Sequence, residues 1–125
     1  MEFKIDTKPA YTILTPICNL LDANLTEALS QKWKELTESG SPNLIVDLHN
    51  CTSTDETSLG NLVSLHEHVY ENRCSIVFTN FQNDVLNALK KNETDLLINV
   101  APTMNEAIDI VSMEILEREL FDEEM

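Results

Sequence analysis

The chain has 125 residues, a length that fits one domain and is too short for two. Hydrophobic residues make up 42% of it, close to the globular average, so a packed core is expected. Twenty-two acidic residues against eight basic ones give a net charge of −14, and only Lys90 and Lys91 form a basic pair. This charge argues against binding to nucleic acid or to an anionic membrane surface. The two glycines, Gly40 and Gly60, are too few for a Walker-type phosphate loop or a GxGxxG dinucleotide turn.

The cysteine pattern and the first residues bear on the cellular compartment. Cys18, Cys51 and Cys74 are an odd number without CxxC spacing, so we expect free thiols. The opening Met1–Lys4 leads into alternating polar and apolar residues rather than a signal peptide. No apolar run approaches the roughly 20 residues that span a bilayer. We therefore expect a cytoplasmic protein without direct membrane insertion.

The first third of the chain predicts two strands and a helix. Alternation predicts a short strand at Phe3–Ile5, and the apolar run 11–17 predicts a second strand close enough for antiparallel pairing. Asp22 or Asn24 can cap a helix that ends at Gly40–Pro42. The apolar positions of this helix recur at helical spacing and are Leu25, Ala28, Leu29, Trp33 and Leu36.

Strands and helices alternate over the rest of the chain. The nearly continuous apolar run Leu44–Leu48 is typical of a strand buried on both faces. After a polar loop at 49–57 we expect a helix with its apolar face between Leu59 and Tyr70, and then a strand at 75–79. A helix around Val85–Leu89 and a strand at 96–100 follow, and the last helix begins at Pro102–Thr103. The order β-β-α-β-α-β-α-β-α predicts an α/β fold with a mixed, mostly parallel sheet and four helices. We expect the domain to span residues 1–112 and the acidic residues 113–125 to form a helix end or tail that frays into solvent.

The loop before the second predicted helix carries a dense cluster of polar side chains. Ser53 with Glu56 three residues later fits a capping box, and Asp55 is a rival N-cap. Either choice places Thr57 and Ser58 in the first helical turn, where outward N–H groups and the helix dipole favour an anion. A phosphate on Thr57 is compatible with this position. It adds charge to a patch that already holds two acids, and such a change can break a contact with a partner.

This segment resembles the STAS domain, the fold of bacterial anti-sigma factor antagonists. The family pattern runs from an apolar strand ending Asp-Leu, through a short loop, to Asp-Ser-Ser-Gly-Leu-Gly at a helix start. Asp47-Leu48 matches the strand end, and Asp-Glu-Thr-Ser-Leu-Gly at 55–60 matches the helix start. Asn80 stands where the family often has Asn, the order of elements agrees, and the resemblance covers residues 1–112.

The resemblance implies a phosphorylation switch. In the family, a partner kinase phosphorylates the second Ser of the motif, and that position is Thr57 here, with Ser58 as a minor alternative acceptor. Two residues depart from the pattern, because Glu56 replaces the first Ser and Ser58 replaces the first Gly. Glu56 places a permanent negative charge beside the acceptor, which either weakens kinase recognition or biases the domain toward a phosphorylated-like surface.

The implied function is a regulatory binding module, with no enzyme activity and no cofactor. Unphosphorylated, it would bind an anti-sigma factor that is a serine/threonine kinase with an ATP-binding domain, and a PP2C-type phosphatase would reverse the modification. The expected partner-binding residues are Ser53, Thr54, Asp55, Glu56, Thr57, Ser58 and Asn61. The alternative is a constitutive STAS subunit of a lipid-transport ABC system or a stress-signalling scaffold, which would use the same surface without a phosphate cycle.

Plainer roles compete for the same residues. A helix-start role alone also explains Thr57. Cys51 follows a strand, as a phosphatase nucleophile does, but that chemistry needs an Arg where Thr57 stands. His66 and His68 are two residues apart, so they face different directions on a helix, and we expect no metal site and a semi-buried His66. Asp47 is expected to bond to loop N–H groups at the strand end.

Overall fold

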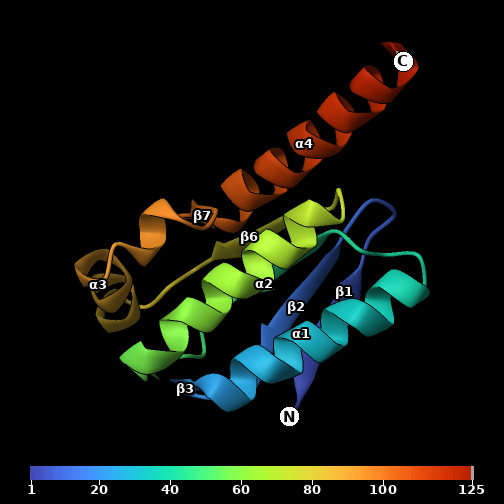
Figure 1. Ribbon diagram of the computed structural model, residues 1–125. Helices are drawn as coiled ribbons and strands as arrows, with labels where there is room; N and C mark the ends of the chain where they lie inside the picture. The colour runs from blue at the N-terminus through green and yellow to red at the C-terminus, as the bar shows by residue number, and fades with distance from the viewer. Residues whose placement is uncertain (125) are drawn as a thin grey trace.

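The computed structural model describes residues 1–124 and the side chains of residues 1–122, so Met125, the last residue of the predicted tail, lies outside the described residues. The strands of the main sheet lie side by side in the order β1 (Phe3–Thr7), β2 (Thr12–Pro16), β4 (Leu44–Asp47), β6 (Ile76–Thr79) and β7 (Val100–Ala101) (Figure 1). β1 and β2 pair antiparallel, whereas every later pair of neighbours is parallel. The predicted mixed, mostly parallel sheet is confirmed.

Helices cover both faces of this sheet. α1 (Ala23–Glu38), α2 (Leu59–Glu71) and α3 (Asn83–Lys91) contribute to one apolar cluster, and α4 (Met104–Glu124) contributes to the other. Figure 1 shows α1 and α2 on one side of the sheet and α4 on the other side of β6. The predicted four helices are therefore confirmed, and within residues 1–124 none of them is long and apolar enough to cross a bilayer.

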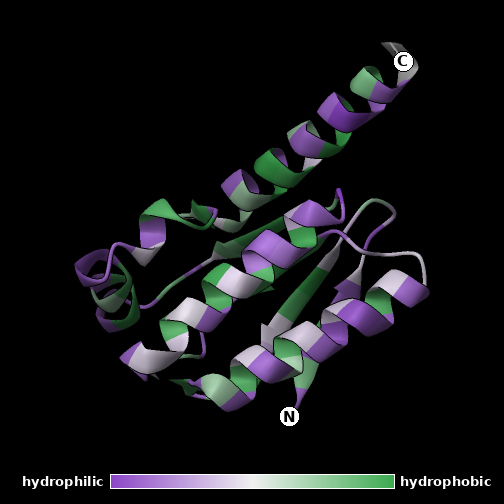
Figure 2. Ribbon diagram, in the orientation of Figure 1, coloured by the Kyte–Doolittle hydropathy of each residue, from purple (hydrophilic) through white to green (hydrophobic). Residues whose placement is uncertain are grey.

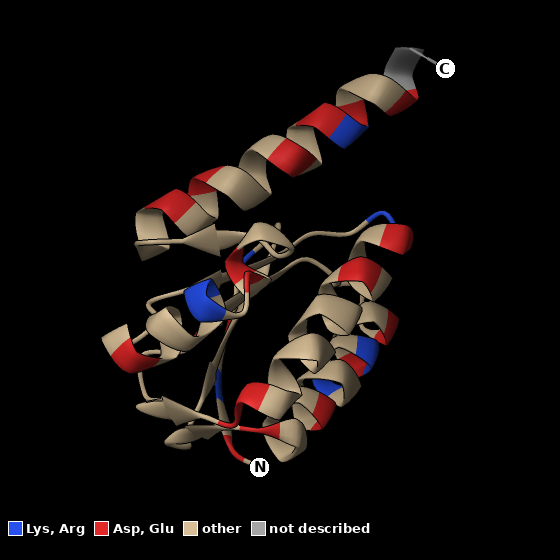
Figure 3. Cartoon of the chain, turned by 60° about the vertical axis from the view of Figure 1, so that its left-hand side comes forward, with Lys and Arg blue, Asp and Glu red and all other residues tan. Residues whose placement is uncertain are grey.

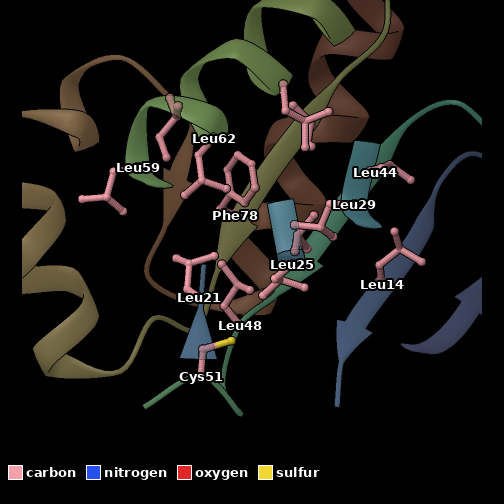
Figure 4. Close-up of a cluster of buried hydrophobic side chains, with 14 of the residues drawn as sticks. Leu14, Leu21, Leu25, Leu29, Leu44, Leu48, Cys51, Leu59, Leu62 and Phe78 are labelled. Carbon is pink, nitrogen blue, oxygen red and sulfur yellow. The ribbon is translucent and has the colours of Figure 1, made fainter. Parts of the chain in front are cut away.

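The core divides at the sheet because successive strand residues point to opposite faces. Leu44 and Val46 of β4 face α1 and α2, whereas Ile45 between them faces α4. Both faces of β4 are buried, as its apolar run predicts. Figure 2 shows the apolar character of the central strands, and Figure 4 shows Phe78 of β6 beside Leu62 of α2 in the larger cluster.

The strand predicted at 96–100 is largely wrong. The chain turns at Glu93, whose φ of 58° lies in the left-handed region, and enters the 3₁₀ helix η2 (Thr94–Leu96). Only the last predicted residue reaches β7. Leu96 and Leu97 are 75% and 59% exposed, so this apolar run does not mark a buried strand. The turn before it decides the local conformation.

A second, two-stranded sheet joins the predicted polar loop to the segment before α1. β3 (Leu20–Leu21) and β5 (Ser53–Thr54) pair in parallel, with Leu20 opposite Ser53. Two-residue strands have no recognisable periodicity, and their pairing joins segments that are 33 residues apart. This small sheet anchors the loop in front of α2 to the segment that leads into α1.

α4 continues as a helix through Glu124 at its acidic end. Glu114, Arg118 and Asp122 recur every four residues and share one face of the helix. The Ser75 hydroxyl donates to Glu114 Oε1 at 2.7 Å, and an Arg118 Nη2 lies 2.8 Å from the same Ser75 oxygen. Arg73 pairs with Asp122 at 2.5 Å. These contacts join α4 to the body of the domain between Glu114 and Asp122, and those at Ser75 are the better buried ones.

A polar cluster between α2 and α4 adds to this attachment. The Tyr70 hydroxyl donates to Glu114 Oε1 at 2.6 Å and accepts a hydrogen bond from the Asn99 amide. Burial, followed by the hydrogen bond and the charge of Glu114, raises the pKa of Tyr70 above its ordinary value. The phenol therefore stays protonated and keeps donating to the α4 carboxylate.

Candidate functional site

The start of α2 is a single 3₁₀ turn, η1 (Glu56–Ser58), that continues directly into the helix. Asp55 caps this turn, because its Oδ1 accepts from the Thr57 backbone N–H at 3.0 Å and from the Thr57 hydroxyl at 2.7 Å. Of the two predicted caps, Asp55 is the one in use. The predicted capping box with Ser53 does not form, because Ser53 belongs to β5.

The two candidate phosphate acceptors have opposite surroundings. The Thr57 side chain is exposed at the surface. Ser58 is only 1% exposed, and its hydroxyl lies 2.7 Å from the Asp55 carbonyl and 3.3 Å from the Leu21 carbonyl. An enzyme can reach the Thr57 hydroxyl on the folded domain, whereas Ser58 becomes accessible only if this region opens.

The surface around Thr57 is acidic. Asp55 and Glu56 are both exposed, and Figure 3 shows how acidic residues outnumber basic ones over the molecule. Lys91, at the end of α3, approaches Glu56 Oε1 at 3.8 Å. A long, exposed ion pair of this kind contributes little to stability. Lys91 was not among the predicted site residues, because no sequence spacing links the end of α3 to this loop.

The other predicted contact residues lie around the same turn. Ser53 is exposed, and Thr54 is half-buried, with its hydroxyl donating to the Leu21 carbonyl at 3.0 Å. Asn61 is exposed in the first turn of α2. The predicted residues form one continuous region, but Ser58 lies beneath it rather than on its surface.

A shallow groove of about 460 Å³ runs between α1 and α2 beside this region. Asn61 and His68 line it from α2, and Glu27 and Lys34 line it from α1. Sequence reasoning missed the α1 residues. The sequence shows Glu27 and Lys34 only as polar residues two helical turns apart, a pattern that most surface helices share.

Two residues considered for other roles have structural explanations. Cys51 is 1% exposed, and burial together with the neighbouring Cys18 raises its pKa to about 12, so at neutral pH it lacks the thiolate population that a phosphatase nucleophile requires. Asp47 Oδ1 accepts from the His49 backbone N–H at 3.1 Å, as predicted for the strand end. The His49 ring nitrogen Nδ1 lies 2.9 Å from the same oxygen.

His66 is half-buried on the apolar face of α2, as predicted. Its Nε2 is buried without a hydrogen-bond partner, and its ring lies 4.5 Å from the Tyr70 ring between centroids. Burial lowers the pKa of His66, and the charges of Glu114 and Glu67 oppose this shift. Among the side chains of residues 1–122, no group of three or more from His, Cys, Asp or Glu is placed to hold a metal ion.

Comparisons with known proteins agree with this architecture. The sequence matches the STAS domain family over residues 3–107. No curated protein sequence matches it. Among solved structures, it is similar to a candidate anti-sigma factor antagonist from Thermotoga maritima, with 19% identity, a TM-score of 0.75 and coverage of 88% of this chain and 94% of the other.

Two further structures place the fold in different settings. The unphosphorylated form of the Bacillus protein SpoIIAA, an anti-sigma factor antagonist, shares 15% identity at a TM-score of 0.66, covering 89% of this chain and 96% of the other. The mouse anion transporter Slc26a9 shares 17% identity at a TM-score of 0.67, covering 86% of this chain but only 18% of the transporter. At these identities the likeness is one of fold, and the family match over residues 3–107 shows that this chain belongs to the STAS domain family.

Proposed function

We propose that this chain is a phosphoregulated binding module that resembles the anti-sigma factor antagonists, with Thr57 as its phosphate acceptor. The observation that carries the proposal is the exposed Thr57 hydroxyl in the turn before α2, next to a buried Ser58. A protein of the same fold, SpoIIAA, has been solved both with and without phosphate, which supports a phosphate cycle on this architecture. The proposed setting is the cytoplasm.

The proposed partner is an anti-sigma factor that is also a serine/threonine kinase with an ATP-binding domain. The kinase transfers the γ-phosphoryl group of ATP to the Thr57 oxygen and releases ADP, so this chain supplies only the hydroxyl. A PP2C-type phosphatase hydrolyses the phosphothreonine and restores the hydroxyl. No cofactor bound to this chain is needed for either step.

Phosphorylation acts on the contact through charge. The Thr57 hydroxyl now donates to Asp55 at 2.7 Å, and a phosphate removes that donor. The phosphate instead places about −1.5 to −2 charges beside the carboxylates of Asp55 and Glu56. Like charges at this distance repel, and a partner that covers the patch must also desolvate the phosphate. The modified surface therefore loses affinity for the partner that binds the unmodified one.

The proposed contact surface consists of the loop from Ser53 to Thr57, Asn61 and the adjoining groove between α1 and α2. The acidic patch favours a basic face on the partner, because complementary charges speed association and select against wrong partners. Asn61 and the groove extend this surface along α2.

Glu56 favours a second candidate, a constitutive subunit of a lipid-transport ABC system or of a stress-signalling scaffold. Its carboxylate gives the patch a permanent charge next to Thr57. In that case the same surface would bind its partner whether or not position 57 carries a charge.

The experiment that separates these functions is affinity capture from native lysate with three purified baits: wild type, Thr57→Glu and Thr52→Glu. Thr52 is exposed in the same loop, so its substitution controls for added charge. We expect wild type and Thr52→Glu to retain an ATP-binding kinase that Thr57→Glu loses by about tenfold or more, roughly 1.4 kcal/mol. Equal retention of that kinase by all three baits contradicts the switch, and equal retention of a transporter ATPase supports the constitutive subunit.

A further inference from the structure

Two of the three cysteines lie at the entrance of the small β3–β5 sheet. The register of this parallel pair sets Leu20 opposite Ser53. Cys18 and Cys51 each lie two residues before these strands, outside the paired residues, and there the Cys51 backbone N–H donates back to the Leu48 carbonyl at 3.0 Å. A disulfide requires Cα atoms roughly 4.4–6.8 Å apart, so the contacts between these two segments decide whether the thiols can meet.

Hydrogen bonds show that the two segments stay together beyond the two-residue strands. The Thr52 backbone N–H donates to the Asn19 carbonyl at 2.9 Å. The Cys51 thiol donates to the Cys18 carbonyl at 3.6 Å, so this sulfur points across to the neighbouring segment. The Cys18 thiol is also close enough to add to burial in raising the pKa of Cys51.

We propose that Cys18 and Cys51 form a redox-responsive pair that closes reversibly into a disulfide. Cys18 is half-buried and reachable from solvent, whereas Cys51 is 1% exposed. The third cysteine, Cys74, is buried before β6, and its thiol bonds to the Asn72 carbonyl at 3.2 Å. Cys18 and Cys51 are therefore the candidate pair, and Cys74 serves as a control cysteine that should not react.

The oxidant is a low-molecular-weight disulfide such as oxidised glutathione. The Cys18 thiolate attacks one sulfur of this disulfide, which forms a mixed disulfide and releases one small thiol. The Cys51 thiolate then attacks the Cys18 sulfur and releases the second small thiol. Two protein thiols are oxidised, one small disulfide is reduced to two thiols, and the protein protons pass to solvent and the leaving thiols. The second step is the slow one, because burial leaves little Cys51 in the thiolate form.

Closure acts on the loop that leads to η1. A bond between Cys18 and Cys51 fixes the segment just before β3 to the segment just before β5, and the chain reaches Asp55 directly after β5. The linkage also reduces the number of conformations open to the unfolded chain, and this stabilises the folded state. It requires neither phosphate nor a partner, so it stands or falls independently of the function proposed for Thr57.

The test is incubation of the full folded chain with oxidised glutathione, followed by intact mass measurement and non-reducing peptide mapping. Wild type and Cys74→Ser are expected to lose about 2 Da, to show a Cys18–Cys51 cross-linked peptide and to revert with dithiothreitol. Cys18→Ser and Cys51→Ser should show no such loss. The linked chain should melt roughly 10 °C higher than the reduced chain.

Three results would overturn the proposal. The first is a stable glutathione adduct on Cys18 that does not progress to the internal disulfide. The second is a cross-link that involves Cys74, and the third is a linked chain that melts below the reduced one. Because wild type and Cys74→Ser alone decide these outcomes, a folding defect in a Cys51 variant leaves the test intact.

Discussion

Glutamate substitutions at Ser58 and at Thr57 should destabilise the domain to very different degrees, because Ser58 is buried and Thr57 is exposed. Ser58 is 1% exposed, and its hydroxyl lies within hydrogen-bond distance of two backbone carbonyls, whereas Thr57 projects to solvent. The same charge is therefore forced into the interior at one position and onto the surface at the next. We expect Ser58→Glu to destabilise the domain severely and Thr57→Glu to leave it folded.

The magnitudes follow from the contacts. Ser58→Glu loses a buried hydrogen bond, worth about 1 kcal/mol, and requires burial of a longer, unpaired carboxylate, which costs several kcal/mol more. A total of roughly 4 kcal/mol or more is a large part of the usual 5–15 kcal/mol stability of a domain. Thr57→Glu loses only the exposed hydroxyl bond to Asp55 and adds like-charge repulsion, about 1 kcal/mol together.

Urea unfolding followed by circular dichroism measures both changes. With an m-value of roughly 1.5 kcal/mol/M, Ser58→Glu should lower the unfolding midpoint by about 2.5 M or leave no folded baseline, and Thr57→Glu should lower it by less than about 1 M. Equal midpoints for the two variants would refute the assignment of Ser58 to the interior and Thr57 to the surface.

Three further substitutions test other parts of the structure. Asp55→Ala removes the cap of η1 and should lower the free energy of unfolding by about 1 kcal/mol in urea titrations; unchanged stability contradicts the cap. Because the folded pKa of His66 lies below its ordinary 6.5, the unfolded chain binds the proton first, so stability falls as the pH drops below about 6.5. His66→Phe should flatten this dependence in urea titrations between about pH 5 and 7, and an unchanged slope argues against the histidine as its source. Arg118→Met removes the contact with Ser75 and should speed amide exchange in the last turns of α4, whereas unchanged exchange would mean that other contacts hold the helix.

Apolar patterning predicted the elements that are long or buried on both faces. The run at 44–48 became β4 because its residues contact helices on both sides of the sheet. The run at 96–100 had similar apolar character, but Glu93 turns the chain into η2 and leaves two leucines exposed. Hydrophobicity alone does not distinguish these cases, because it does not report which neighbour covers a segment.

The helix start at Asp55 and Thr57 was predicted from the sequence, but its local geometry was not. The polar cluster and the helix start located Asp55 and Thr57, since capping follows local rules. The burial of Ser58 depends on the Leu21 carbonyl, which β3 brings from a distant part of the chain. In the same way, the sequence of the acidic end of α4 indicates a solvated tail, whereas in the structure Arg73 and Ser75 contact its acidic side chains. Long-range pairing of short segments decided each difference.

Phosphopeptide mapping of the chain purified from its native cells tests the central claim most directly. Peptides that cover residues 53–61 separate Thr57 from Ser58, Thr54 and Ser53 by fragment masses. We expect phosphate on Thr57 and its loss in Thr57→Ala expressed in the same cells. Phosphate on a different hydroxyl, or phosphate that persists on the Thr57→Ala chain, would contradict Thr57 as the switch residue.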